Sequence, residues 1–306
     1  MTLAVPATGA APPDVASADA AAGALLVFWD YDTQWGADRS RNPASRRDWG
    51  HLDFEHSERL LELHAEFGIP ACFAVVGAAA LPGVRPYHDP AQIRRLHAAG
   101  HEIASHAFRH EWLPALHGAA LTETLVRSRD ALEQCIGAPV TTFVPPFNQP
   151  FDHLRGGSIS LAERRAVPRG RTDLARLCQA LAGAGYRCCR VSYRPLHVRA
   201  AEWLTRRRRD RPMRPLRIGG VTALRLNTPG GFDAPALAML ERVAAEGGLV
   251  VAYGHPHSLH TGNSQDERFL TPFLRRAREL ARAGALRLAR PRDLVAAAGR
   301  IAADAG

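Results

Sequence analysis

Short apolar runs that alternate with amphipathic segments are the feature that most constrains the fold of this chain. Runs of this length that are bounded by turn residues are typical of buried β-strands. Eight of them predict strands, at residues 24–29, 71–76, 102–105, 140–144, 188–192, 221–226, 249–253 and 285–288.

Segments with apolar residues at helical spacing lie between most of these runs. They predict helices over residues 55–67, 90–99, 122–135, 172–184, 234–245 and 267–283, with a last helix from 291 to about 303. Alternation of this kind favours parallel strands covered by helices, and seven or eight such units are enough to close a barrel. We therefore expect an α/β fold, a (β/α) barrel of about seven parallel strands.

Three stretches interrupt this alternation. Residues 148–171 are polar, and residues 195–220 carry an arginine block, so both are expected to be long loops with a functional role. Residues 1–23 are rich in Ala, Pro and Asp and lack the basic start and apolar core of a signal peptide. We expect a disordered tail over residues 1–23 and a single domain over residues 24–306.

The charge of the chain at first suggests a nucleic-acid partner, since the formal net charge is +9. However, all 39 basic residues are arginine and none is lysine, which indicates coding bias, and the block Arg206 to Arg209 lacks interleaved aromatic residues. We expect no nucleic-acid partner, and no membrane span because no uncharged apolar stretch approaches about 20 residues. The five cysteines match no zinc-ligand spacing and indicate free thiols in a reducing compartment, hence a cytoplasmic protein. The amino-acid sequence does not indicate the oligomeric state.

Residues suited to metal binding and acid–base chemistry directly follow several of the predicted strands. In parallel α/β folds the loops that leave the carboxyl ends of the strands gather at one face, where active sites lie. His106 and His110 are four residues apart in the loop after the third predicted strand, and this spacing can place both imidazoles on one metal ion. The residues that obey this rule are Asp30, Asp32, His106, His110, 145–148 and His255.

The sequence around these residues resembles the polysaccharide deacetylases with a NodB homology domain, carbohydrate esterase family 4. The family motif T-F-D-D-G corresponds to residues 28–32, here F-W-D-Y-D, and H-S/T-x-x-H corresponds to 106–110, here H-A-F-R-H. The motif R-P-P-Y-G corresponds to 144–148, here V-P-P-F-N, and the apolar strand that ends in histidine corresponds to 250–255. The resemblance covers roughly residues 24–290 and implies a divergent member with the distorted barrel of this family.

The resemblance also implies a metal centre. Asp32, His106 and His110 correspond to the family's ligands for a divalent ion, most commonly Zn²⁺, which polarises a carbonyl group and lowers the pKa of water. Asp30 corresponds to the base that removes the proton from the attacking water. Because Asp30 and Asp32 are alternate residues, the chain must turn at the strand end for both side chains to serve one site.

The remaining roles concern the oxyanion and the leaving amine. By resemblance, the backbone N–H of Phe147 stabilises the oxyanion and His255 protonates the amine. Two more histidines, His257 and His260, either join the site or are exposed to solvent beside it, and we expect exposure. The implied function is a metal-dependent hydrolase of non-peptide C–N bonds that removes an N-acetyl or other acyl group from an N-acetylated sugar or glycoconjugate. A hydrolase of cyclic amides and a non-catalytic saccharide-binding module remain as alternatives.

Three positions depart from the family pattern. Val144 stands where the family has the arginine beside the base carboxylate, and we expect another arginine, such as Arg109 or Arg194, to reach in from a different loop. Ala107 stands where the family has a hydroxyl residue, so other hydrogen bonds must hold the histidine loop. Asn148 replaces glycine and either narrows one wall of the site or offers a polar contact to substrate.

Overall fold

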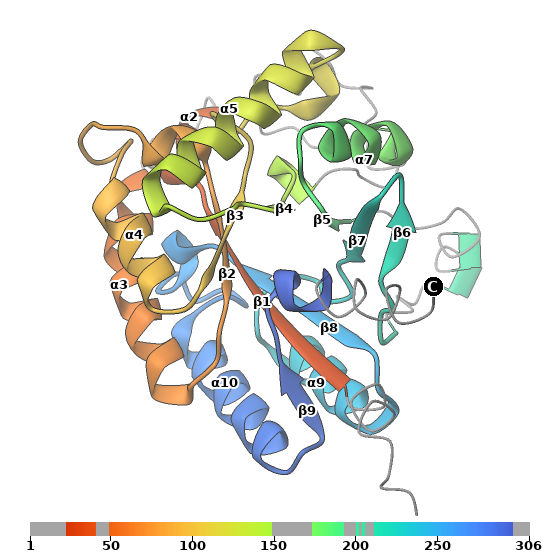
Figure 1. Ribbon diagram of the computed structural model, residues 1–306. Coiled ribbons are helices and arrows are strands. Elements are labelled where there is room, and N and C mark those ends of the chain that lie inside the picture. Colours follow the sequence, from red (N-terminus) through yellow and green to blue (C-terminus); the bar gives the residue numbers. More distant parts are fainter. Residues whose placement is uncertain are drawn as a thin grey trace, which may run out of the picture.

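A mostly parallel sheet that curls into a barrel forms the centre of the protein, and helices surround it (Figure 1). The computed structural model describes residues 23–40, 49–148, 173–192, 200–201, 204–205 and 211–295. Within these ranges the strand order is β6-β7-β5-β4-β3-β2-β1-β8, with β9 paired to β1. The α/β barrel expected from the sequence is confirmed. The predicted amino-terminal tail and the loop at 148–171 lie almost wholly outside the described residues, and the division into domains stays a prediction.

All eight predicted strands are present, with shifts of one or two residues at their ends. The strands are β1 (Gly23–Tyr31), β2 (Cys72–Val75), β3 (Glu102–Ser105), β4 (Thr142–Phe143), β5 (Cys188–Val191), β6 (Leu216–Ile218), β7 (Val221–Arg225), β8 (Leu249–Gly254) and β9 (Leu286–Leu288). The prediction that 195–220 is loop throughout is wrong, because β6 lies in it and pairs antiparallel with β7. Gly219 and Gly220 have φ of 54° and 84°, as a two-residue hairpin turn requires.

The predicted helices between the strands are also present. The helices are α2 (Thr33–Ser40), α3 (Gly50–Phe67), α4 (Pro90–Ala98), α5 (Ala119–Ile136), α7 (Leu174–Gly183), α9 (Ala234–Glu246) and α10 (Glu267–Arg282), and the short 3₁₀ turns are η1 (Gly77–Ala80), η2 (Leu113–Ala115), η3 (Pro146–Asn148) and η4 (Pro256–Ser258). The sequence did not predict α2, because this eight-residue helix is mostly polar. The last predicted helix is seen over 291–295, and its remainder lies outside the described residues. A search of the described helices finds none whose length and apolar character would suit a bilayer.

Side-chain alternation along the strands separates the barrel interior from the layer beneath the helices. All nine residues of β1 are buried, which fits a strand covered on both faces. Leu26 and Phe28 belong to an apolar cluster whose other strand members come from β2, β3, β5, β7 and β8, so they face the interior. Leu25 and Val27 belong to the cluster that includes the helices. With this two-residue period, Asp30 continues the inner face of β1.

Side chains help to join β7 to β8 where the curled sheet closes. The Asn227 amide donates to the carbonyl of Leu249 at 2.9 Å, and its oxygen accepts the N–H of Val251 at 2.9 Å. The Thr228 hydroxyl donates to the carbonyl of Val251 at 3.0 Å, and Met213 forms an antiparallel bridge with Leu249. Asn227 therefore supplies the donor and acceptor that a neighbouring strand would offer.

Two buried histidines, His64 of α3 and His101 before β3, form hydrogen bonds with β1 and with the segment that leads into β2. The indole N–H of Trp29 donates to His64 Nε2 at 2.8 Å, and His64 Nδ1 donates to the carbonyl of Ile69 at 2.8 Å. His101 Nδ1 accepts the N–H of Ala71 at 3.1 Å. Burial lowers the pKa of His64 to about 3 and that of His101 to about 4. Both imidazoles are therefore neutral in the folded protein at neutral pH.

We predict that these histidines make the fold sensitive to acid. Because the unfolded chain binds protons below pH about 6.5 and the folded chain does not, the contribution of His101 is present above that pH and is lost as pH falls toward 4. The change His101→Asn keeps an acceptor for Ala71 but removes the titration. Urea unfolding should show a pH dependence shallower by up to about 1.4 kcal/mol per pH unit in this window. An unchanged slope would contradict this assignment.

Candidate metal centre and active site

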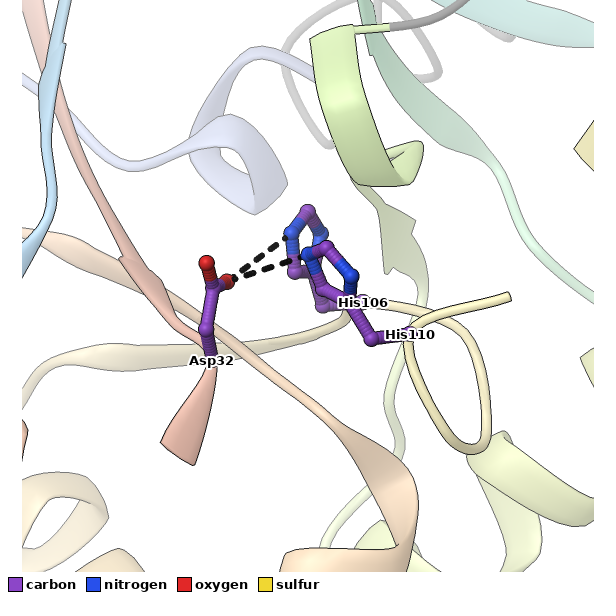
Figure 2. A group of neighbouring side chains, drawn as sticks. All are labelled: Asp32, His106 and His110. Carbon is purple, nitrogen blue, oxygen red and sulfur yellow. Dashed lines mark ion pairs between the residues drawn. The ribbon is translucent and has the colours of Figure 1, made fainter. Parts of the chain in front are cut away.

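Three buried ligand-type side chains converge at the carboxyl end of the barrel. Asp32 directly follows β1 and His106 directly follows β3, whereas His110 lies further along the same loop. Asp32 Oδ1 lies 3.2 Å from His106 Nε2 and 3.5 Å from His110 Nε2. Figure 2 shows the two imidazoles next to each other, both facing the Asp32 carboxylate. These three residues offer one ligand atom each, all within 4.8 Å of one another.

Unusual backbone conformations place these side chains. Thr33 adopts φ of 56° directly after Asp32, so the chain leaves the strand and enters α2, and the expected turn at the strand end is confirmed. His110 adopts φ of 57°, in the left-handed region that non-glycine residues enter at a cost. Gly36 lies so close that a Cβ there would meet the Cβ of Asp32 at 2.4 Å. Glycine at this position lets α2 pack directly on the aspartate.

The histidine loop is held by backbone groups of η1 and by α5. The carbonyl of Ala107 accepts the N–H of Gly77 at 2.9 Å and the hydroxyl of Ser128 at 2.8 Å. The carbonyl of Phe108 accepts the N–H of Ala78 at 2.8 Å. The expectation that other hydrogen bonds replace the hydroxyl missing at Ala107 is therefore confirmed.

The donor set fits a divalent cation. His106 Nδ1 donates to the carbonyl of Val144 at 2.7 Å, so in the neutral imidazole the lone pair of Nε2 points toward Asp32 Oδ1. Among the described residues, buried Asp32 Oδ1 and His110 Nδ1 have no hydrogen-bond partner. Burial raises the pKa of Asp32, but positive charge on the two imidazoles holds it well below its ordinary value, so this carboxylate is stabilised here by adjacent positive charge. Lone pairs that face one another in a buried site repel unless a cation lies between them, and two imidazoles with one carboxylate form a zinc-type set.

Asp30 forms a bidentate ion pair with Arg190 inside the barrel. Arg190 Nη1 and Nη2 donate to the two oxygens of Asp30 at 2.7 and 2.6 Å, and the side chains are 1% and 3% exposed. Burial raises the pKa of Asp30, but the Arg190 guanidinium outweighs it and lowers that pKa below its ordinary value. The expectation that another arginine replaces the motif arginine is confirmed by Arg190. The example Arg109 is wrong, because its guanidinium lies over the rings of Trp35 and Phe108. Arg194 lies outside the described residues.

Arg190 occupies the place next to Val144 on the inner face of the barrel. Phe143 of β4 pairs with Cys189 of β5. The residues that follow them in sequence, Val144 and Arg190, are therefore neighbours. The arginine has therefore moved one strand along, and the small side chain of Val144 leaves room for it. Asn148 Oδ1 accepts from Arg190 Nη2 at 3.0 Å, and Asn148 Nδ2 donates to the hydroxyl of Tyr253 at 2.8 Å. The amide that replaces the motif glycine thus helps to hold the relocated guanidinium.

The two other predicted site residues lie at the same centre. Phe147 adopts φ of 60°, and its ring lies edge-on to His110 with centroids 4.4 Å apart. His255 Nε2 lies 3.9 Å from Asp30 Oδ2, and Gln265 Oε1 contacts His255 Nδ1 at 3.0 Å. The structure therefore gathers all six residues named from the motifs, whereas their catalytic roles stay predictions.

Asp53 and His257 form a contact that the sequence did not reveal. One oxygen of Asp53 accepts the N–H groups of Asp32 at 3.2 Å and Thr33 at 2.7 Å, and the other accepts the N–H of His257 at 2.9 Å and contacts its Nδ1 at 3.1 Å. The expectation that His257 is exposed is wrong, because its side chain is only 16% exposed. His260 is exposed as expected. Asp53 lies in the first turn of α3, two residues before the predicted start of this helix, and no motif marked it.

Comparison with known proteins supports the family inferred from the motifs. A family model described as polysaccharide deacetylase matches residues 48–156, which include His106, His110 and Phe147 but not Asp30, Asp32 or His255. The resemblance to polysaccharide deacetylases is confirmed. The match supports a hydrolase that acts on C–N bonds other than peptide bonds. No curated protein matches the sequence.

Solved structures share the fold at low sequence identity. A Pseudomonas aeruginosa PAO1 protein described as a probable polysaccharide deacetylase is similar with a TM-score of 0.61 and 16% identity, covering 92% of each chain. A Mycobacterium smegmatis protein assigned to the polysaccharide deacetylases has a TM-score of 0.58 and 19% identity, covering 95% of this chain and 93% of its own. Puue allantoinase has a TM-score of 0.58 and 17% identity, covering 90% of each chain. These likenesses show that the chain has the distorted barrel of this family.

We predict that Arg190 and Asp30 stabilise the fold only as a pair. Arg190→Met leaves the Asp30 carboxylate buried without a partner, which should lower the free energy of unfolding by about 3–5 kcal/mol. The double change Arg190→Met with Asp30→Asn removes both charges and should recover part of this loss. Urea unfolding of the three proteins checks the prediction. A double variant at least as destabilised as Arg190→Met would contradict it.

Proposed function

We propose that the protein is a metal-dependent amide hydrolase that removes an acetyl or other acyl group from an N-acylated amino sugar or glycoconjugate. The observation that carries the proposal is the buried group of Asp32, His106 and His110, with its unpaired carboxylate oxygen, beside the Asp30–Arg190 pair. Zn²⁺ is the proposed ion, because two imidazole nitrogens and one carboxylate oxygen suit it and leave further coordination positions open. When bound, the ion polarises the scissile carbonyl and lowers the pKa of the attacking water.

The residues of the chain supply the proton transfers around that centre. Asp30 is ionised because Arg190 stabilises its charge, so it can accept the proton of the attacking water. The backbone N–H of Phe147, beside His110, is proposed to stabilise the oxyanion. An imidazole in the loop after β8 is proposed to protonate the leaving nitrogen, a role that the family motif assigns to His255. Amide cleavage then yields the carboxylic acid and the free amine.

We predict that metal content and acetate release depend together on His106. The wild-type protein should bind about one divalent ion per chain, and His106→Ala should lose it because two ligands remain. Acetate release from N-acetylated sugars should fall more than about 100-fold, since loss of an outer hydrogen-bond partner alone costs 10–100-fold. Elemental analysis and an acetate assay measure the two quantities.

The matched control is His117→Ala, because His117 is exposed in the loop that follows the metal-ligand histidines. This variant should keep both the metal and the activity. Equal acetate release by the wild type and His106→Ala would overturn the proposal. A protein that binds saccharide without an ion and without turnover would instead be a binding module.

A second candidate is a hydrolase of cyclic amides. Two observations favour it: the structural likeness to Puue allantoinase equals that to the mycobacterial protein, and the third motif departs from the deacetylase pattern. Products distinguish the candidates, because a deacetylase releases acetate and a cyclic amidase releases one ring-opened molecule. Proton NMR of reactions with N-acetylglucosamine oligomers and with a panel of cyclic ureides therefore decides between them. The cytoplasmic location stays a prediction, which cell fractionation would test.

A further inference from the structure

The loop after β8 carries two imidazoles whose partners differ in charge. His257 is held at Nδ1 and at its backbone N–H by one oxygen of the Asp53 carboxylate, at 3.1 and 2.9 Å. The Asp53 side chain is fully buried, and its other oxygen accepts the N–H groups of Asp32 and Thr33. Asp53 therefore fixes His257 relative to the loop that carries the metal ligand.

The partner of His255 at Nδ1 is neutral, and the carboxylate of Asp30, 3.9 Å from its Nε2, is already paired with Arg190. One atom of the Gln265 amide lies 2.7 Å from the backbone N–H of His255 and 3.0 Å from its Nδ1. Because a backbone N–H needs an acceptor, that atom is the amide oxygen, and Nδ1 of His255 therefore carries a hydrogen. An amide oxygen orients an imidazole but lacks the negative charge that stabilises an imidazolium. In this chain the carboxylate lies behind His257 instead.

His257 lies beside His255, the imidazole that approaches Asp30. Its ring centroid is 5.1 Å from that of His255, whose Nε2 lies 3.9 Å from Asp30. The indole of Trp49 stacks on the His257 ring at 3.8 Å with an interplanar angle of 27°, which holds the ring plane. Burial lowers the pKa of His257, but Asp53 outweighs it and raises that pKa above its ordinary value, with smaller contributions from Asp32 and Asp30.

We propose that His257, and not His255, donates the proton to the leaving nitrogen, and that Asp53 is its positioning residue. This assignment rests on the proposed amide hydrolase activity. As the C–N bond breaks, its electron pair goes to nitrogen, which takes the proton from Nε2 of the His257 imidazolium. The imidazolium becomes neutral, and Asp30 holds the proton taken from water. Transfer of that proton through solvent to His257 restores both groups.

The leaving group provides a test specific to a proton donor. An alkylamine cannot leave without a proton, whereas 4-nitrophenolate leaves unprotonated, so loss of the donor affects only the amide. His257→Ala should lower kcat for an N-acetylglucosamine oligomer by about 10²–10⁴-fold, with little change in KM. It should hydrolyse 4-nitrophenyl acetate within a few-fold of the wild-type rate. Asp53→Asn, which keeps the shape of the side chain, should show the same selective loss to a smaller degree.

The matched controls are His260→Ala, an exposed histidine of the same loop, and His255→Ala. His260→Ala should leave both reactions unchanged, and His255→Ala should not show the selective loss on the amide. Selective loss in His255→Ala with retained amide turnover in His257→Ala would overturn the assignment. Equal loss of amide and ester turnover in His257→Ala would also overturn it, since that result indicates a structural role. A wild-type protein that cleaves the ester but no amide would refute the proposed function itself, independently of the variants.

Discussion

A buried positive charge on the inner face of the barrel is the constraint on which the site depends. Asp30 continues the inward-facing residues of β1, where a lone carboxylate would be strongly destabilised. Arg190 from β5 supplies the opposite charge, and both groups are almost inaccessible to solvent. The ion pair keeps Asp30 ionised while the same geometry leaves Asp32, two residues later, free to face the histidines.

The strand and helix pattern was predictable because the hydrophobic periodicity is strong. Every predicted strand is buried on at least one face, and the alternation of strands with helices left few topologies open. Two of the elements that were not predicted, β6 and α2, lack that signal. The strand β6 is a three-residue edge strand with exposed side chains, and α2 is a polar helix that begins at a left-handed Thr33. Their positions depend on a glycine turn and on packing, which periodicity does not report.

The candidate site was predictable where residues are close in sequence and not where they are distant. The two histidines and the two aspartates form short motifs, and the barrel rule brings their loops to one face. Arg190 is 160 positions from Asp30, and Asp53 is 204 positions from His257, so no local spacing marks these contacts. One signal for Arg190 was present: a charged residue within an otherwise apolar strand needs a buried partner. Asp53 carried no comparable signal, because acidic residues are common on helices.

The departures from the family motifs change which residue supplies a charge in the site, whereas the charge itself is retained. The inner face needs a cation beside Asp30, and two adjacent strands can supply it, because Val144 and Arg190 are neighbours across β4 and β5. The same reasoning applies to the acid imidazole, since a carboxylate has to lie behind whichever histidine becomes positively charged. Gln265 contacts Nδ1 of His255, whereas the Asp53 carboxylate contacts Nδ1 of His257. The charged partner therefore belongs to the histidine two residues further along the loop. A motif comparison that counts residues by position would therefore score this chain as incomplete, although the layer of charges inside the barrel is intact.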